Sequence, residues 1–241
     1  SQTGGGCRAS NYVALLRKAL KDLGMEQIPV ISFNMVGLER NPGFTITPKL
    51  AHSLIYGALY GDIMMKCLYR VRPYEIEKGT AQYVMDSWFD KIVSNCMDLN
   101  KKTFKKNLDA IVKDFDSIPI HEDMVKPRVG IVGEILVKYH PNANNDLVHT
   151  IEEEGGEAVV PSFIDFFEYG FINKVFNYNN LSGTWKDMAI NKVLLSFIES
   201  YRKYSREACR KSKRFEPDCR IEDTARNAER FISIGNQCGE G

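Results

Sequence analysis

The residues with the clearest chemical potential lie near the start of the sequence, where Gly4, Gly5 and Gly6 precede Cys7 and Arg8. Glycines let the backbone approach a ligand closely. The residues after Arg8 have helical spacing, and the free N–H groups at a helix start stabilise a thiolate. Cys7 could therefore ligate a metal cluster or act as a nucleophile. The alternative is a flexible terminus beside an ordinary cysteine, because three glycines and a cysteine are a weak motif.

A second candidate site lies in residues 127–163, which have the pattern strand, loop, helix, strand. The apolar run 129–132 is typical of a strand buried on both faces of a parallel sheet. Ligands of open α/β sheets bind beyond the carboxyl ends of the strands. This rule places Glu134 and the loop 139–145 at the expected site, with Glu134 and His140 as candidate catalytic acid or base.

Both of these side chains also have a simpler explanation. A carboxylate at a strand end often caps a neighbouring helix, so Glu134 could be such a cap. A lone loop histidine is more often structural or simply exposed. For the helix within this unit, we expect Asp146 or Asn145 at the N-terminus and Gly155 at the C-terminus.

The rest of the chain is predicted to be mainly helical, with one further strand at residues 28–33. The loop after that strand could also face a site. The first expected helix starts after Cys7 and ends at Gly24, and the second starts at Pro48 and ends near 69–75. Further helices are expected at 80–96, 101–115, in a segment from 163, and at 185–213 and 221–233. These elements predict an α/β protein with two lobes, residues 1–118 and 127–241, separated by a linker near 117–126. A glycine-rich end and few strands suggest that the second lobe is truncated.

Three charged residues of the long helix leave alternatives open. Asp62 falls within an apolar run and is either a buried functional acid or, more simply, a capped or solvent-facing one. Arg70 and Arg72 lie among tyrosines and could bind an anion. Exposed pairs with nearby glutamates, at positions 75 and 77, are the simpler interpretation.

Composition excludes several classes of protein. The chain has 241 residues and a formal net charge of +1, which gives no electrostatic reason to expect nucleic acid or a membrane surface as a partner. No run of about 18 apolar residues occurs, and the polar start does not resemble a signal peptide. Six cysteines without a CxxC pair indicate a reducing, cytoplasmic compartment. We expect Cys67 and Cys96 to be small buried residues.

Four segments, in order along the chain, carry a family resemblance. They are residues 2–12, 69–75, 127–146 and 235–241. Together they resemble motifs of the activase-related proteins of the 2-hydroxyacyl-CoA dehydratase system. The large members of that family join ATPase activase modules to a dehydratase-like region, and this chain is similar to part of that region. Neither GxGxxG nor the P-loop pattern occurs, so we do not expect this chain to bind ATP.

The resemblance implies anaerobic redox chemistry. Activases use ATP hydrolysis to drive an electron from one 4Fe–4S cluster to another in the dehydratase, which then forms a ketyl radical from the acyl-CoA. The resemblance implies flavodoxin/Rossmann-like lobes with short parallel sheets and a large helical portion. It makes Cys7 a cluster ligand, flanked by Gly5, Gly6 and Arg8. The remaining ligands would come from other segments or from Cys238.

The expected partners are activase ATPase modules or dehydratase subunits, and acyl-CoA is the candidate substrate. We expect the isolated chain to be inactive. A non-catalytic docking or regulatory α/β domain without its own cluster is the alternative function.

Overall fold

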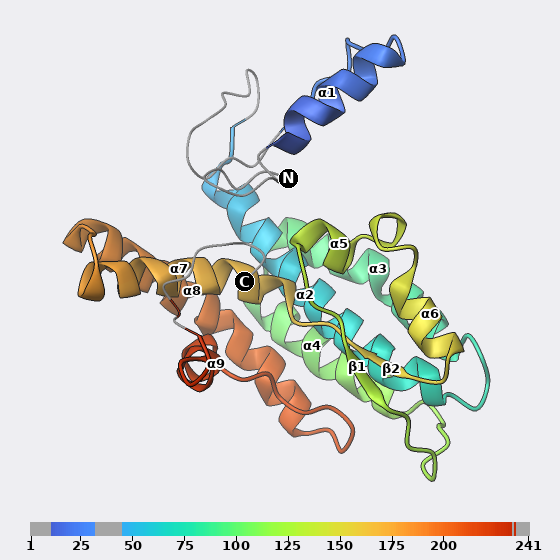
Figure 1. Cartoon of the computed structure of the whole chain (residues 1–241). Helices are drawn as coiled ribbons and strands as arrows, with labels where there is room; N and C mark the ends of the chain where they lie inside the picture. Colours follow the sequence, from blue (N-terminus) through green and yellow to red (C-terminus); the bar gives the residue numbers. More distant parts are fainter. Residues whose placement is uncertain (1–10, 32–44, 233, 235–241) are drawn as a thin grey trace. The chain divides into compact units, whose positions relative to one another are not determined.

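The computed structural model describes residues 11–31, 45–232 and 234. The chain divides into two compact units, Ser1–Pro48 with Gln237–Gly241, and Lys49–Asn236. In the first unit, helix α1 (Tyr12–Asp22) confirms the expected helix (Figure 1). It is followed by Gly24, whose φ of +67° is easily adopted by glycine.

The strand expected at 28–33 is wrong where the structure describes it. Residues 28–31 have no regular structure, and the N–H of Ile28 closes a turn by donating to Met25. A β-rich composition forms a strand only where a neighbouring strand accepts its hydrogen bonds. No such neighbour is present among the residues that the structure describes.

The second unit begins with three long helices that match the expected segments closely. They are α2 (Pro48–Val71), which continues into the short 3₁₀ turn η2 (Arg72–Tyr74), α3 (Thr80–Asp98) and α4 (Lys101–Asp116). Their apolar faces share a core that contains Tyr56, Phe104 and Phe115. Asn100 fixes the start of α4, because its side chain accepts hydrogen bonds from the N–H groups of Lys102 and Thr103.

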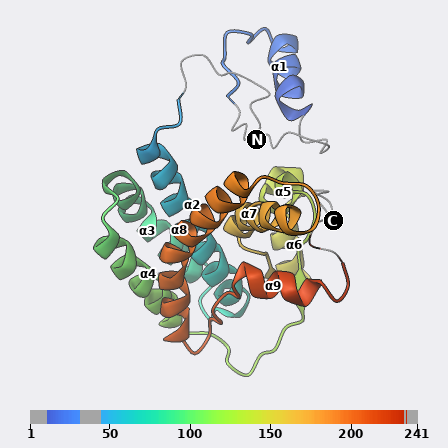
Figure 2. The ribbon, with the colours of Figure 1, turned by 90° about the vertical axis from the view of Figure 1, so that its left-hand side faces the viewer.

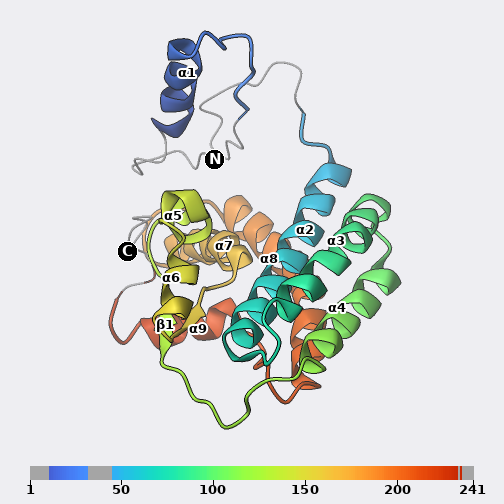
Figure 3. The ribbon, with the colours of Figure 1, turned by 90° about the vertical axis from the view of Figure 1, so that its right-hand side faces the viewer.

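A parallel β–α–β unit follows, as expected. Strand β1 (Arg128–Gly130) pairs with β2 (Glu157–Val159) in parallel, with Val129 opposite Ala158. Between them lie α5 (Ile135–Tyr139), the 3₁₀ turn η3 (Pro141–Ala143) and α6 (Leu147–Glu153). Gly155 follows α6 with a φ of +86°, which confirms the expected glycine end. Figures 2 and 3 show α3 and α4 on one side of α2, and α5 and α6 on the other.

Three details of this unit differ from expectation. β1 is exposed along its length, and β2 is the better buried strand, because β2 carries Glu157 and Ala158 toward the rest of the unit. The expected loop 139–145 contains the end of α5 and all of η3. At the start of α6, the side chain of Asn144 accepts the N–H of Leu147, whereas Asp146 at the N-cap position makes no side-chain cap.

A helical hairpin completes the second unit. Helix α7 (Phe163–Asn180) packs along α8 (Trp185–Arg210), and α8 also packs on α4 (Figure 1). The short helix α9 (Ile221–Ala228) contacts α7 and is shorter than expected. α7 ends at Asn180, and residues 181–184 connect it to α8.

The fold is mostly helical with a two-stranded parallel sheet, which is consistent with the broad α/β class. Tertiary contacts divide the chain at Pro48 and gather residues 49–236 into one unit. The reason is that α4 packs on α8, and the end of α2 contacts β2. None of the helices in the described ranges combines the length and apolar character that a membrane span requires.

Candidate functional site

A cavity of about 330 Å³ lies beside β2 in the second unit. Its walls come from α2, the first residue of β1, β2 with the loop that follows it, the start of α7, α8, the loop 214–219 and α9. This volume is at the lower end of the range for small-molecule pockets. The lining is strongly charged and places arginines, a lysine and several carboxylates around the same space.

Asp62 joins one wall of the cavity to another. It lies in α2, is 8% exposed, and accepts hydrogen bonds from the backbone N–H groups of Phe163 at 2.6 Å and Ile164 at 3.0 Å. Ser162 occupies the N-cap position of α7 but makes no side-chain cap. Asp62, from another helix, supplies the capping acceptor instead. Burial raises the pKa of Asp62 to about 7, although the two backbone hydrogen bonds act in the opposite direction.

Arg202 forms the centre of a buried cluster of charges. This α8 residue is 2% exposed and donates to Glu168, while a second nitrogen lies 2.6 Å from Asp165 and 3.9 Å from Asp218. Burial raises the pKa of Glu168 to about 7 and also raises the pKa of Asp165, with Arg202 opposing both shifts. The second carboxylate oxygen of Glu168, Oε1, is buried and has no hydrogen-bond partner in the described part of the chain.

Glu157 holds together the opposite end of the cavity. It is the first residue of β2 and is 1% exposed. Its Oε2 accepts hydrogen bonds from Arg70 and, at 2.8 Å, from the hydroxyl of Tyr74, and its Oε1 lies 3.2 Å from Nε of Arg128. The Glu157 carboxylate therefore connects three parts of the fold, namely α2 with η2, β1 and β2.

The surface pairs expected for Arg70 and Arg72 are wrong. Arg70 pairs with Glu157, and Arg72 pairs with Glu152 through Nε at 2.8 Å and Nη2 at 2.9 Å. The reason is that the β–α–β unit packs against the end of α2 and brings these carboxylates within reach. Glu75 instead accepts the N–H groups of Gly79 and Ala81, at the start of α3.

The two candidate catalytic residues lie outside this cavity lining. Glu134 is buried, and its Oε2 accepts the N–H groups of Leu136 at 3.0 Å and Val137 at 3.3 Å, so the alternative of a helix cap is confirmed. Its Oε1 is buried without a hydrogen-bond partner among the described residues. His140 is exposed just after α5. A catalytic role for Glu134 and His140 stays a prediction.

The residues expected at a cluster, Gly5, Gly6, Cys7 and Arg8, lie outside the described residues, as does Cys238. Of the other cysteines, Cys67 and Cys209 are buried, Cys96 is half-buried, and Cys219 is exposed beside the cavity. Burial raises the pKa of the Cys67 thiol, and raises that of Cys209 to about 11. Cys67 and Cys209 lie in the hydrophobic core of the second unit, so packing is sufficient to explain both thiols.

Within residues 11–31, 45–232 and 234, no group of three or more histidine, cysteine or acidic side chains is arranged to hold a metal ion. A cluster on this chain would therefore need at least one ligand from outside the described ranges, where Cys7 lies. Comparisons with models of known protein families, with curated proteins and with solved structures gave no match.

Several residues of the cavity were not singled out by the sequence. Arg202 belongs to a basic segment that also suits a helix C-terminus, so its own sequence neighbourhood does not distinguish it. Asp165 and Glu168 did carry a signal, because they lie three residues apart in an otherwise aromatic helix start. Acidic residues at that spacing share one helix face, and a buried face requires a cation as partner.

Proposed function

We propose that this chain is part of the dehydratase-like region of an iron–sulfur protein in the 2-hydroxyacyl-CoA dehydratase and activase system. Its role is in ATP-driven electron transfer to 2-hydroxyacyl-CoA, or in the radical dehydration of that substrate. The proposal includes flavodoxin-like lobes, a cytoplasmic location, and activase ATPase modules or dehydratase subunits as partners.

One observation carries most of the support. Residues 127–146, which resemble a family motif, form the first half of a parallel β–α–β unit, and the second strand of that unit borders a charged cavity. A ligand site beside a parallel strand is typical of α/β lobes. The motif at 69–75 supports the same proposal, because Arg70 and Tyr74 contact this unit through Glu157.

The proposed cofactor is a 4Fe–4S cluster with Cys7 as a ligand, flanked by Gly5, Gly6 and Arg8. Such a cluster, when bound, supplies single electrons. Glu134 and His140 are the proposed acid and base candidates. Glu134 already caps α5, whereas His140 is exposed, so His140 is the more accessible of the two.

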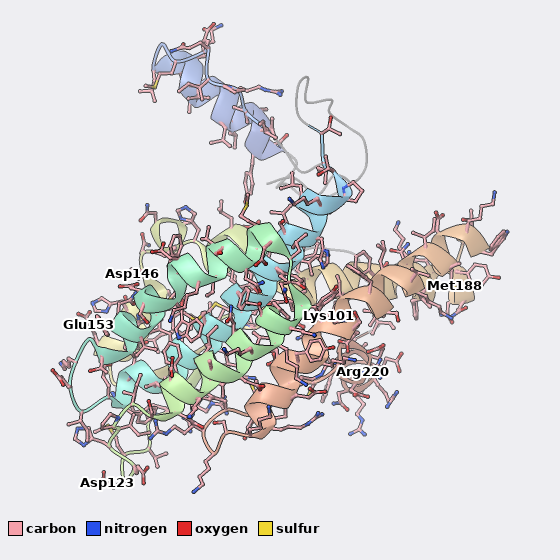
Figure 4. All side chains as sticks on the ribbon, turned by 180° about the vertical axis from the view of Figure 1, so that it is seen from behind. Lys101, Asp123, Asp146, Glu153, Met188 and Arg220 are labelled. Atoms are coloured by element: carbon pink, nitrogen blue, oxygen red, sulfur yellow. The ribbon has the colours of Figure 1, made fainter. Side chains whose placement is uncertain are left out.

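A docking or regulatory domain without its own cluster is a second proposal, and a specific surface favours it. The free end of the α7–α8 hairpin exposes large apolar side chains at Leu181, Trp185 and Val193. Met188 marks this end of α8 in Figure 4. Exposed apolar patches often mark sites of protein–protein contact.

Anaerobic reconstitution with iron and sulfide tests the first proposal. Iron content and charge-transfer absorption would be compared in the wild type, in Cys7→Ala and in the matched control Cys96→Ala, which changes a half-buried cysteine of α3. We expect a stoichiometric cluster in the wild type and in the control, and its loss in Cys7→Ala. A cluster that persists in Cys7→Ala would remove Cys7 as a ligand.

The same measurement on a chain extended at both ends addresses a site divided between segments. A cluster that forms only in the extended chain would support the redox proposal and place the remaining ligands in the added segments. A chain that forms no cluster in either length would contradict that proposal and leave the docking domain.

A further inference from the structure

We propose that Arg70 and Arg128 form a binding site for an oxyanion carried by a small molecule, at the end of the cavity where both arginines contact Glu157. The site uses neither Cys7 nor an iron–sulfur cluster. It therefore goes beyond the proposed function, and its test is independent of cluster formation.

A buried carboxylate, Glu157, contacts both arginines. Glu157 is 1% exposed, and it receives Arg70 and the Tyr74 hydroxyl on Oε2 and Arg128 on Oε1. The side chain of Arg70 also lies over the ring of Tyr74, with 5.4 Å between the guanidinium carbon and the ring centroid. Arg70 thus has two contacts and Arg128 has one before any ligand arrives, and this partial ordering lowers the entropy cost of binding.

The charges at this end of the cavity do not balance. Two guanidinium groups share one carboxylate, and within the described part of the second unit neither of them reaches another carboxylate at salt-bridge distance. One cation is sufficient to neutralise Glu157, so a purely structural role leaves the second arginine unexplained. An oxyanion would balance the remaining positive charge and accept paired hydrogen bonds from the guanidinium edges.

The two guanidinium groups are accessible from the cavity. Both side chains belong to the lining, with 42% of Arg70 and 59% of Arg128 exposed. A guanidinium has five N–H donors, and Glu157 engages only part of them. A ligand can therefore bind these side chains without displacing them from Glu157.

The other end of the cavity limits what the rest of the ligand can be. There, Lys66 is paired with Asp218 at 2.6 Å, and Arg202 is neutralised by Asp165 and Glu168. These acidic side chains disfavour a second anionic group. The ligand class is accordingly a small molecule with one oxyanion, either a phosphate monoester or a carboxylate, and with a neutral, hydroxyl-bearing remainder.

Arg72 provides a matched control. It lies two residues from Arg70 and forms a one-to-one bidentate pair with Glu152, and it is not part of the cavity lining. Its replacement removes one arginine charge close to Arg70 and leaves both guanidinium groups of the proposed site in place.

The test measures anion binding to the full chain at constant ionic strength. Inorganic phosphate, glycerol 3-phosphate and acetate would be titrated in turn, with ³¹P line width reporting the phosphates and the rise in thermal midpoint reporting all three. We expect saturable binding to the wild type, weakened by about tenfold or more in Arg128→Gln and unchanged within about twofold in Arg72→Gln. A preference for phosphate or for acetate identifies which oxyanion the site takes.

Several results would overturn the proposal. They are the absence of saturable binding by any of the three probes, equal affinity in Arg128→Gln and the wild type, and an equal loss in Arg72→Gln. If Arg128→Gln does not fold, Arg128→Lys keeps the charge and removes the guanidinium fork, so we expect several-fold weaker phosphate binding. Unchanged affinity in that variant would equally contradict the site.

Discussion

The carboxylate of Asp62, in the middle of α2, accepts the backbone N–H of Phe163 at 2.6 Å and so caps a helix that begins 101 residues later. The first N–H groups of a helix have no partner within the helix, and here Asp62 accepts two of them, one in a part-buried and one in a buried hydrogen bond. Asp62 therefore ties α7 to α2 and sets one wall of the charged cavity.

Removing this cap should cost stability. We expect Asp62→Ala to lower the free energy of unfolding by about 1–3 kcal/mol, because two backbone N–H groups, one of them buried, lose their acceptor. Ser162→Ala, at the N-cap position itself, should change it by less than about 0.5 kcal/mol, since Ser162 makes no side-chain cap. Urea unfolding of both variants measures the difference, and equal effects would show that Asp62 is not the cap in solution.

Stability should also fall as the pH rises from about 5 to 8. Asp62 and Glu168 have folded-state pKa values of about 7, above their usual values of 3.8 and 4.5. Between these limits the folded chain holds protons that the unfolded chain has released, so raising the pH favours unfolding. Below the usual values both states are protonated, and the dependence from these groups disappears.

A double variant isolates this contribution from that of other titrating groups. Asp62→Asn with Glu168→Gln removes both carboxyl groups while keeping their shape. We expect a shallower decline in the free energy of unfolding between pH 5 and 8 than in the wild type, measured by urea unfolding at several pH values. Parallel curves for the two proteins would show that neither carboxyl group has a raised pKa.

The ion pair between Arg202 and Glu168 should show strong coupling. Arg202→Met leaves Glu168 and Asp165 without their shared cation, and we expect a loss of about 3–5 kcal/mol. Glu168→Met in the same chain removes one of the stranded carboxylates, so the double variant should lose less than the sum of the two single variants. Additive losses in a double-mutant cycle would contradict the pairing.

The cysteines should differ sharply in reactivity. Cys219 is exposed, whereas Cys67 and Cys209 are buried with raised thiol pKa values. We expect a brief pulse of iodoacetamide to label Cys219 in the native chain, and to label Cys67 and Cys209 only after unfolding. Peptide mass mapping resolves each site, and rapid native labelling of Cys67 would show that the α2–α8 core opens readily.

Local patterns in the sequence were sufficient to predict most of the helices and strands. The helices α2, α3 and α4 and the parallel β–α–β unit follow from the periodicity of apolar residues and from turn-forming residues such as Gly155. These patterns depend on residues close together in the sequence, so they can be recognised without the tertiary structure. The strand predicted at 28–33 was wrong at residues 28–31, because a strand also needs a neighbouring strand, which local composition does not supply.

The sequence by itself determined that a charged residue, Asp62, would interrupt the apolar positions of α2. Only the tertiary structure decided which charges meet. Arg70 pairs with a carboxylate 87 residues away, and Asp62 finds its donors across a similar separation. Such partners depend on how α2, β2 and α7 pack against one another, which no local pattern encodes. The same packing removes water from the buried acids and so sets their pKa values.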